Sequence, residues 1–198
     1  TSRYKLILFA WPLIQFFLLF GSLISICWFN HLTLLEAIIL MLVQGMITGA
    51  VGITFAHELM HQKTKLERFL ADVLMAMAFY GHFRTEHVFV HHRYVGTKKD
   101  AVTARFNESF YTFFLRVIPQ CLISAWSVEA QKLAAKNKST FNMSNPFYIY
   151  AALASLFVLL SFIIGGTYGI TLFFIQAFVA ILHLEVVNYI EHYGLSSP

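Results

Sequence analysis

The sequence predicts an all-α protein that spans a membrane several times and holds a histidine-rich metal site at its cytoplasmic face. Of its 198 residues, 58% are hydrophobic and 12% are charged, a composition that excludes an ordinary soluble domain and is typical of polytopic membrane proteins. Three long stretches carry no charge, and each is long enough to cross a bilayer, which requires about 20 apolar residues. The motifs HELMHQ and EHVFVHH hold five of the nine histidines.

The first two predicted spans form a hairpin near the N-terminus. The segments from Leu6 to Asn30 and from Ala37 to Ala56 contain no charged residue, and the turn between them contains no Lys or Arg. The first segment is longer than the apolar core of a signal peptide, which is about 7–15 residues, so it is interpreted as a span. The second span delivers His57 to the membrane face opposite that turn.

The stretch from His57 to Pro146 is polar enough to lie outside the bilayer. It contains every Lys and Arg except Arg3 and Lys5, so the positive-inside rule predicts that it is cytoplasmic together with the N-terminus. The isoelectric point of about 9.1 indicates a basic surface suited to anionic lipid headgroups or to an acidic electron carrier. The cations expected there are Arg84, Arg93, Lys98, Lys99 and Arg105.

Two segments of this stretch have apolar residues at helical spacing, 66–83 and 108–136. Such stripes either pack on the spans, form a core or lie at the membrane interface, and the spacing does not separate these alternatives. Aromatic residues of the second segment suit the headgroup level. They are Phe110, Phe113, Phe114 and Trp126.

A second hairpin is predicted at the C-terminal end. The segment from Phe141 to Leu182 has no charged residue and is interrupted at 165–169 by the sequence GGTYG, a turn signal. This predicts spans three and four with their connection on the outer side, so that His192 returns to the face that carries the other motifs. We expect four spans within one domain, residues 1–198.

The histidine spacing predicts how the side chains are directed. On an α-helix, residues four apart share a face, so His57 with His61, and His87 with His91, are each placed to bind one ion. His92 would lie about 100° further round than His91 and would point elsewhere, for instance at a second ion. This many imidazoles without thiolates suit iron, copper or zinc.

Polar residues near the histidines are candidates to hold the ligands in one tautomer by accepting their second N–H. These candidates are Glu58, Glu86, Glu185, Asn188 and Glu191. For the three glutamates that adjoin a histidine, the alternative is a solvated surface carboxylate. Glu185 lies inside a span, where a carboxylate is costly, so we expect it to point at the site or at Asn188.

The first motif also fits the H-E-x-x-H pattern of zinc metalloproteases, in which Glu58 would be the general base. That interpretation leaves EHVFVHH and Glu191-His192 without a role, and no Asp-Gly motif offers a third ligand of the intramembrane type. Cys27 and Cys121 are isolated, so neither a disulfide framework nor a thiolate metal site is indicated.

Three motifs in order carry a resemblance that covers essentially the whole chain: HELMHQK, EHVFVHHRYVGTKKDAVTARFNES and NYIEHYGL. They resemble the histidine motifs of the membrane-bound alkane 1-monooxygenase family, which is related to xylene monooxygenases and, more distantly, to fatty acid desaturases. Three positions depart from the family pattern: Met60 and Val90 stand where it often has Gly, and Ala101 where it often has Pro.

The resemblance implies an integral protein of the bacterial inner membrane, a non-haem di-iron oxygenase. It would hydroxylate the terminal methyl of an alkane with O₂, using electrons from rubredoxin and an NAD(P)H-dependent rubredoxin reductase. Implied ligands of the two iron ions are His57, His61, His87, His91, His92 and His192. No catalytic residue beyond the metal centre and no nucleic-acid partner is implied. A desaturase or xylene-type hydroxylase on the same scaffold stays an alternative, and the zinc protease a weaker one.

The family pattern also includes a third motif, H-x-x-H-H, downstream of NYIEHYGL, and two spans upstream of the first one here. Neither is present in these 198 residues. We therefore expect a fragment truncated at both ends, with four of six spans.

Overall fold

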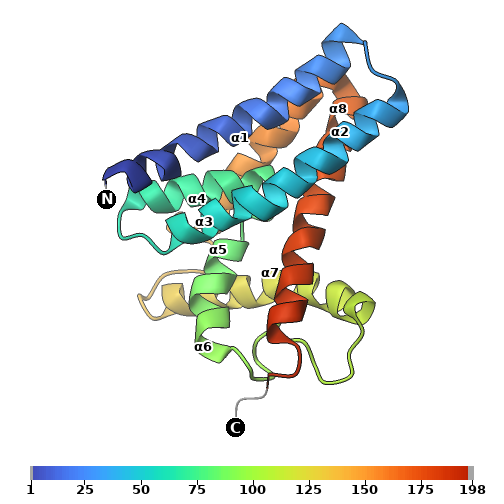
Figure 1. Ribbon diagram of the computed structural model, residues 1–198. Helices are drawn as coiled ribbons and strands as arrows, with labels where there is room; N and C mark the ends of the chain where they lie inside the picture. The colour runs from blue at the N-terminus through green and yellow to red at the C-terminus, as the bar shows by residue number, and fades with distance from the viewer. Residues whose placement is uncertain (1, 196–198) are drawn as a thin grey trace. The chain divides into compact units, whose positions relative to one another are not determined.

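The computed structural model describes residues 2–195, with side chains from Tyr4 onward, and confirms the all-helical prediction, since these residues contain no strand (Figure 1). In chain order, with η denoting a π-helix, the elements are α1 (Ser2–Phe29), α2 (Leu34–Ile47), η1 (Thr48–Gly52), α3 (Ile53–Met60), α4 (Lys65–Met77), α5 (Phe83–Glu86), η2 (His87–His91), α6 (His92–Tyr94), α7 (Phe110–Ala134) and α8 (Phe147–His192). The described residues form two compact units, 2–81 with Ala151–His183, and His82–Tyr150 with 184–195.

Three stretches of helix are long and apolar enough to cross a membrane: Tyr4–Phe29, Leu34–Met60 and Phe147–His192. The third is broken at Gly165 and Gly166, and Gly166 has φ +58°, a conformation that glycine adopts without a steric penalty. Beyond the break, Gly169 packs on the carbonyl of Ser161, which a straight helix would hold about 12 Å away. The chain therefore reverses, and α8 supplies the two arms of the predicted second hairpin.

Glycines on one face of the second span allow close packing in the first unit. An added Cβ at Gly45 would lie 2.6 Å from both the carbonyl oxygen of Gln176 and the Cβ of Val179, and one at Gly49 would lie 2.9 Å from the Cβ of His183. Small residues of this kind let helices approach closely in membranes, where dispersion contacts drive association. Because Gly45 and Gly49 have no side chain, α2 and η1 can pack closely against α8.

Helix α4 belongs to the packed interior of the first unit and ends earlier than the sequence suggested, at Met77 rather than Phe83. Thr64 and Glu67 form a capping box at its start, and Gln176 of α8 donates to the carbonyl of Met77 at its end (2.7 Å). The interior side chains are Ala71, Leu74, Met75 and Met77. Leu66, the first residue of the predicted apolar stripe, is exposed.

The second unit is built on α7. Ser109 caps this helix, and Phe113, Val117 and Cys121 pack on the loop residues Ala101, Val102 and Ala104. The aromatic residues that we predicted at the headgroup level divide between two faces. Phe113 is fully buried and Phe110 is partly buried, whereas Trp126 is exposed.

The glycine contact yields a stability prediction. Gly45→Ala should destabilise the protein by about 1–3 kcal/mol, because the new methyl group meets a backbone oxygen that cannot move without shifting α8. Gly21→Ala is the matched control, because nothing lies within 4 Å of a Cβ at that helical position. SDS-induced unfolding in mixed micelles measures both, and equal midpoints for the two variants would show that Gly45 is not a packing contact.

Candidate metal centre

The first histidine pair lies at the end of α3. His57 is in the last turn of the helix and His61 follows it as the C-cap residue. Their ring centroids are 4.8 Å apart and both side chains are exposed, so the predicted proximity of this pair is confirmed. Oε1 of Glu58 accepts a hydrogen bond from Nε2 of Gln62 (3.0 Å), four residues further along the chain.

The second motif is wound as a π-helix, which changes the predicted pairing. The N–H of His92 bonds to the carbonyl of His87, five residues earlier, and this wider turn brings residues five apart onto one face. The Nε2 atoms of His87 and His92 are 2.9 Å apart. We expected His92 to point elsewhere than the pair of His87 and His91 if the α-helix continued. The π-helix does not meet that condition, and His92 lies against His87 instead.

Two other histidines of the second unit meet beside this pair. The ring centroids of His91 and His192 are 4.7 Å apart, and His91 also stacks on His87 at 5.3 Å. Nδ1 of His192 is 2.7 Å from the backbone carbonyl of Asn188. Because a carbonyl only accepts, Nδ1 of His192 carries the proton and Nε2 presents its lone pair.

Asp100 holds His91 in the same way. Its Oδ2 lies 3.0 Å from Nδ1 of His91 and also accepts from the hydroxyl of Thr103 at 2.6 Å, while its Oδ1 accepts from the N–H of Val102. Burial opposes ionisation of Asp100, but the hydrogen bonds from His91 and Thr103 outweigh it and lower the pKa of the carboxyl. Asp100 was not among the predicted site residues, because it lies in a loop where helical spacing gives no signal.

The predicted supporting residues have different roles. Glu185 is fully buried and accepts from the side-chain amide of Asn188 (3.1 Å), as expected, and the backbone of Asn188 holds His192. Glu86 is also buried, and burial first, then Asp100 and Glu185 nearby, raise its pKa to about 8, against an opposing contribution from Cys121. Glu191, by contrast, is exposed.

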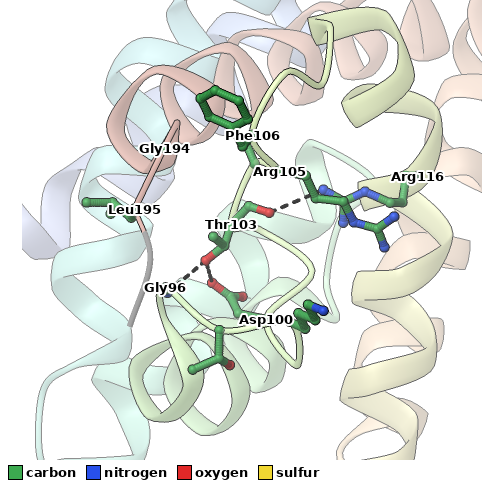
Figure 2. A pocket seen from close by; sticks show the side chains of 11 residues that line it. Gly96, Asp100, Thr103, Arg105, Phe106, Arg116, Gly194 and Leu195 are labelled. Atoms are coloured by element: carbon green, nitrogen blue, oxygen red, sulfur yellow. Dashed lines mark hydrogen bonds between the residues drawn. The ribbon is translucent and has the colours of Figure 1, made fainter. Parts of the chain in front are cut away.

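The loop that carries Asp100 is fastened to α7 by Arg116. The guanidinium donates to both carboxylate oxygens of Glu108, each at 2.8 Å, and to the carbonyls of Ala101 (2.9 Å) and Thr103 (3.2 Å). A pocket of about 940 Å³ opens beside this loop (Figure 2). Its cationic lining residues are Lys98, Arg105 and Arg116.

The donor set fits a transition-metal ion. Two imidazole nitrogens at about 2.1 Å from one ion and at a right angle to each other are about 3 Å apart, which matches the 2.9 Å between Nε2 of His87 and Nε2 of His92. His91 and His192 have their Nδ1 atoms engaged by oxygen acceptors, the arrangement that orients metal-binding histidines. Nitrogen donors without thiolates favour iron, copper or zinc.

Comparison with known proteins identifies the family. The sequence model named fatty acid desaturase matches residues 32–198, and the chain belongs to this family. It is 36% identical over 151 residues to alkane 1-monooxygenase 2 of Alcanivorax borkumensis and 41% identical over 152 residues to alkane 1-monooxygenase 1 of Pseudomonas aeruginosa, in each case covering 76% of this chain and 40% of the relative. Alkane 1-monooxygenase of Ectopseudomonas oleovorans is 34% identical over 187 residues, 89% of this chain and 44% of that protein. The chain thus matches about two fifths of the length of these relatives.

The role of Asp100 can be measured through metal affinity. Asp100→Asn should weaken binding by about 10–100-fold, because it removes the charge that orients His91 and raises its basicity. Glu191→Gln makes the same change at an exposed carboxylate and should leave the affinity unchanged. Competition between the purified protein and a chromophoric chelator for Fe²⁺ or Co²⁺ gives both values, and an unaltered affinity in Asp100→Asn would remove Asp100 from the site.

Proposed function

We propose that this chain is the central part of a membrane-bound, non-haem di-iron monooxygenase that hydroxylates the terminal methyl of medium- or long-chain alkanes to primary alcohols. The observation that carries the proposal is the group of four histidines in the second unit: the Nε2 atoms of His87 and His92 are 2.9 Å apart, and the rings of His91 and His192 lie beside them. Asp100 orients His91, and the carbonyl of Asn188 orients His192. Membership of the fatty acid desaturase family and the similarity to alkane 1-monooxygenases support it.

The proposed ligands of two iron ions are His57, His61, His87, His91, His92 and His192. When bound, such a centre supplies O₂ activation and the oxidant that an unactivated C–H bond requires. The protein's own contribution is to keep each imidazole in one tautomer. Asp100 does this for His91 and the Asn188 carbonyl for His192. The apolar spans give access to an alkane, which partitions into lipid.

We also propose that the electrons come from rubredoxin and its NAD(P)H-dependent reductase, at the cytoplasmic side of the inner membrane. Four of the five expected surface cations, Arg93, Lys98, Lys99 and Arg105, are exposed. Arg84 is partly buried over the ring of Tyr150 at 5.5 Å and does not belong with them. A surface of this charge favours an acidic protein and speeds its association at low salt.

Removal of a ligand tests the centre directly. In the full-length enzyme, His57→Ala or His91→Ala should lose bound iron together with alkane hydroxylation, because the coordination shell is opened. His31→Ala is the control, since His31 is exposed in the loop between α1 and α2 and should keep both. Metal analysis and alcohol formation are the measurements. A His91→Ala enzyme with full iron content and turnover would refute the ligand assignment.

The same purified enzyme also tests two alternative functions, a desaturase and a zinc metalloprotease. A desaturase on this scaffold is favoured by the family match, and it would release an alkene rather than an alcohol from a saturated substrate. A zinc metalloprotease at His57-Glu58-x-x-His61 has no support from the relatives and would contain zinc rather than iron. Product analysis and metal analysis therefore distinguish the three reactions.

Charge reversal tests the electron partner. Arg93→Glu combined with Lys98→Glu should slow reduction of the enzyme by rubredoxin several-fold at low ionic strength, with the difference shrinking as salt is added. Lys136→Glu is the control, because it is also exposed but follows the far end of α7. Identical rates for the double variant and the parent enzyme at low salt would exclude this surface as the docking site.

A further inference from the structure

Helix α7 exposes a continuous apolar stripe in addition to the face that it buries. Positions 111, 115, 122 and 126 fall on one side of an α-helix, with 123 at its edge. The exposed fractions are 81% for Tyr111, 76% for Leu115, 46% for Leu122, 65% for Ile123 and 36% for Trp126. A surface helix in contact with water on this side would carry polar residues there. The stripe therefore faces an apolar environment.

The ends of α7 show where that environment is. Trp126 packs against Phe147, the first residue of the membrane-spanning helix α8, with ring centroids 5.0 Å apart. Near the other end, Phe113 lies 5.4 Å from Tyr189, three residues before α8 ends at His192. Since α8 doubles back at Gly165 and Gly166, both of its ends leave the bilayer on the same side.

The two contacted residues, Phe147 and Tyr189, belong to the same compact unit as α7 and adjoin the membrane-spanning arms in the chain. The contacts are made at positions 113 and 126, about 20 Å apart along the helix, so the long side of α7, rather than one end, packs on the segments that lead into the membrane. The exposed apolar surface continues past the helix, because Phe141 is 73% exposed and packs on Trp126 at 5.9 Å, and Met143 is 79% exposed. Both residues precede the start of α8.

We propose that α7 lies in the plane of the membrane, with the stripe from Tyr111 to Trp126 inserted into the boundary between lipid headgroups and acyl chains. Tyr and Trp, which occur at the two ends of the stripe, are enriched at this depth because one end of each side chain is polar. Gln120, Ser127 and Gln131 form an exposed polar flank toward water. Lys136 and Lys138 follow the helix and suit anionic headgroups.

This placement connects the lipid surface with the histidine group. The opposite face of α7 packs on Ala101, Val102 and Ala104, and its Arg116 binds the carbonyls of Ala101 and Thr103 in the loop that carries Asp100. Insertion of the stripe would thus fix the depth of the loop that orients His91.

Spin labels can measure the depth of each face. The full-length chain, with Cys27, Cys121 and any other cysteine replaced by alanine, receives one cysteine at Leu115 or Leu122 in the stripe, or at Gln120 or Ser127 on the polar flank. Each variant is labelled with a nitroxide in nanodiscs of phosphatidylglycerol and phosphatidylethanolamine. Relaxation by O₂, which concentrates in lipid, is compared with relaxation by a water-soluble nickel chelate.

We expect labels at 115 and 122 to collide several-fold more with O₂ than with the chelate, and labels at 120 and 127 to show the reverse. Chelate access at 115 and 122 equal to that at 120 would mean that the stripe faces water. Protection of 115 and 122 from both reagents would mean that a protein surface covers it. Either outcome overturns the proposal.

A second measurement leaves α7 unchanged. With Trp11, Trp28 and any other tryptophan replaced by phenylalanine, the fluorescence of Trp126 reports its own depth. Lipids brominated near the glycerol end of the acyl chain should quench it more than lipids brominated near the chain terminus, and aqueous iodide should quench it weakly. Strong iodide quenching without quenching by either lipid would contradict the proposal.

Discussion

The geometry of the histidine group depends on one backbone hydrogen bond, from the N–H of His92 to the carbonyl of His87. In an α-helix the same N–H would reach the carbonyl of Val88, and His92 would turn away from His87. The extra residue in the π turn instead sets the Nε2 atoms of these two histidines 2.9 Å apart. It also leaves His91 directed toward Asp100 and His192. Such turns are rare and are frequently found at functional sites, and in this short segment the π turn gives the imidazoles their observed arrangement.

The orientation of His91 depends on the buried carboxylate of Asp100, which lies in the loop after the motif EHVFVHH. Asp100 is 3% exposed and accepts from His91, Thr103 and Val102, so its charge is stabilised without water. Arg116 then fixes the loop backbone from α7. Loss of one partner from a buried ionic network costs about 3–5 kcal/mol, more than a surface pair contributes. The orientation of His91 therefore depends on Arg116 and the loop that it fixes, as well as on Asp100.

The sequence predicted where the helices lie better than it predicted whether a given turn is an α turn or a π turn. Charge-free runs located the spans, and the glycines at 165 and 166 located the reversal in α8. Histidine spacing identified His57 with His61 correctly, because α3 is α-helical up to the C-cap. It failed for His92, because no residue pattern distinguishes a π turn from an α turn. It missed Asp100 because the contact with His91 depends on the path of a loop.

A related limit explains why the packed faces of the apolar helices could not be predicted from hydrophobicity. In water, large apolar residues mark the buried face, but in a bilayer lipid is as apolar as the interior of the protein. On the second span the closest contacts with α8 are made at Gly45 and Gly49, whereas the larger Leu42 and Met46 are exposed. On α7 the buried face includes Cys121 and Ala125, while Leu115 and Ile123 are exposed. Small side chains at these positions admit a neighbouring backbone, but large ones such as Met41 and Phe113 are buried as well. Neither hydrophobicity nor size alone therefore separates protein-facing from exposed positions here, because large apolar side chains can be solvated by acyl chains as well as by the protein.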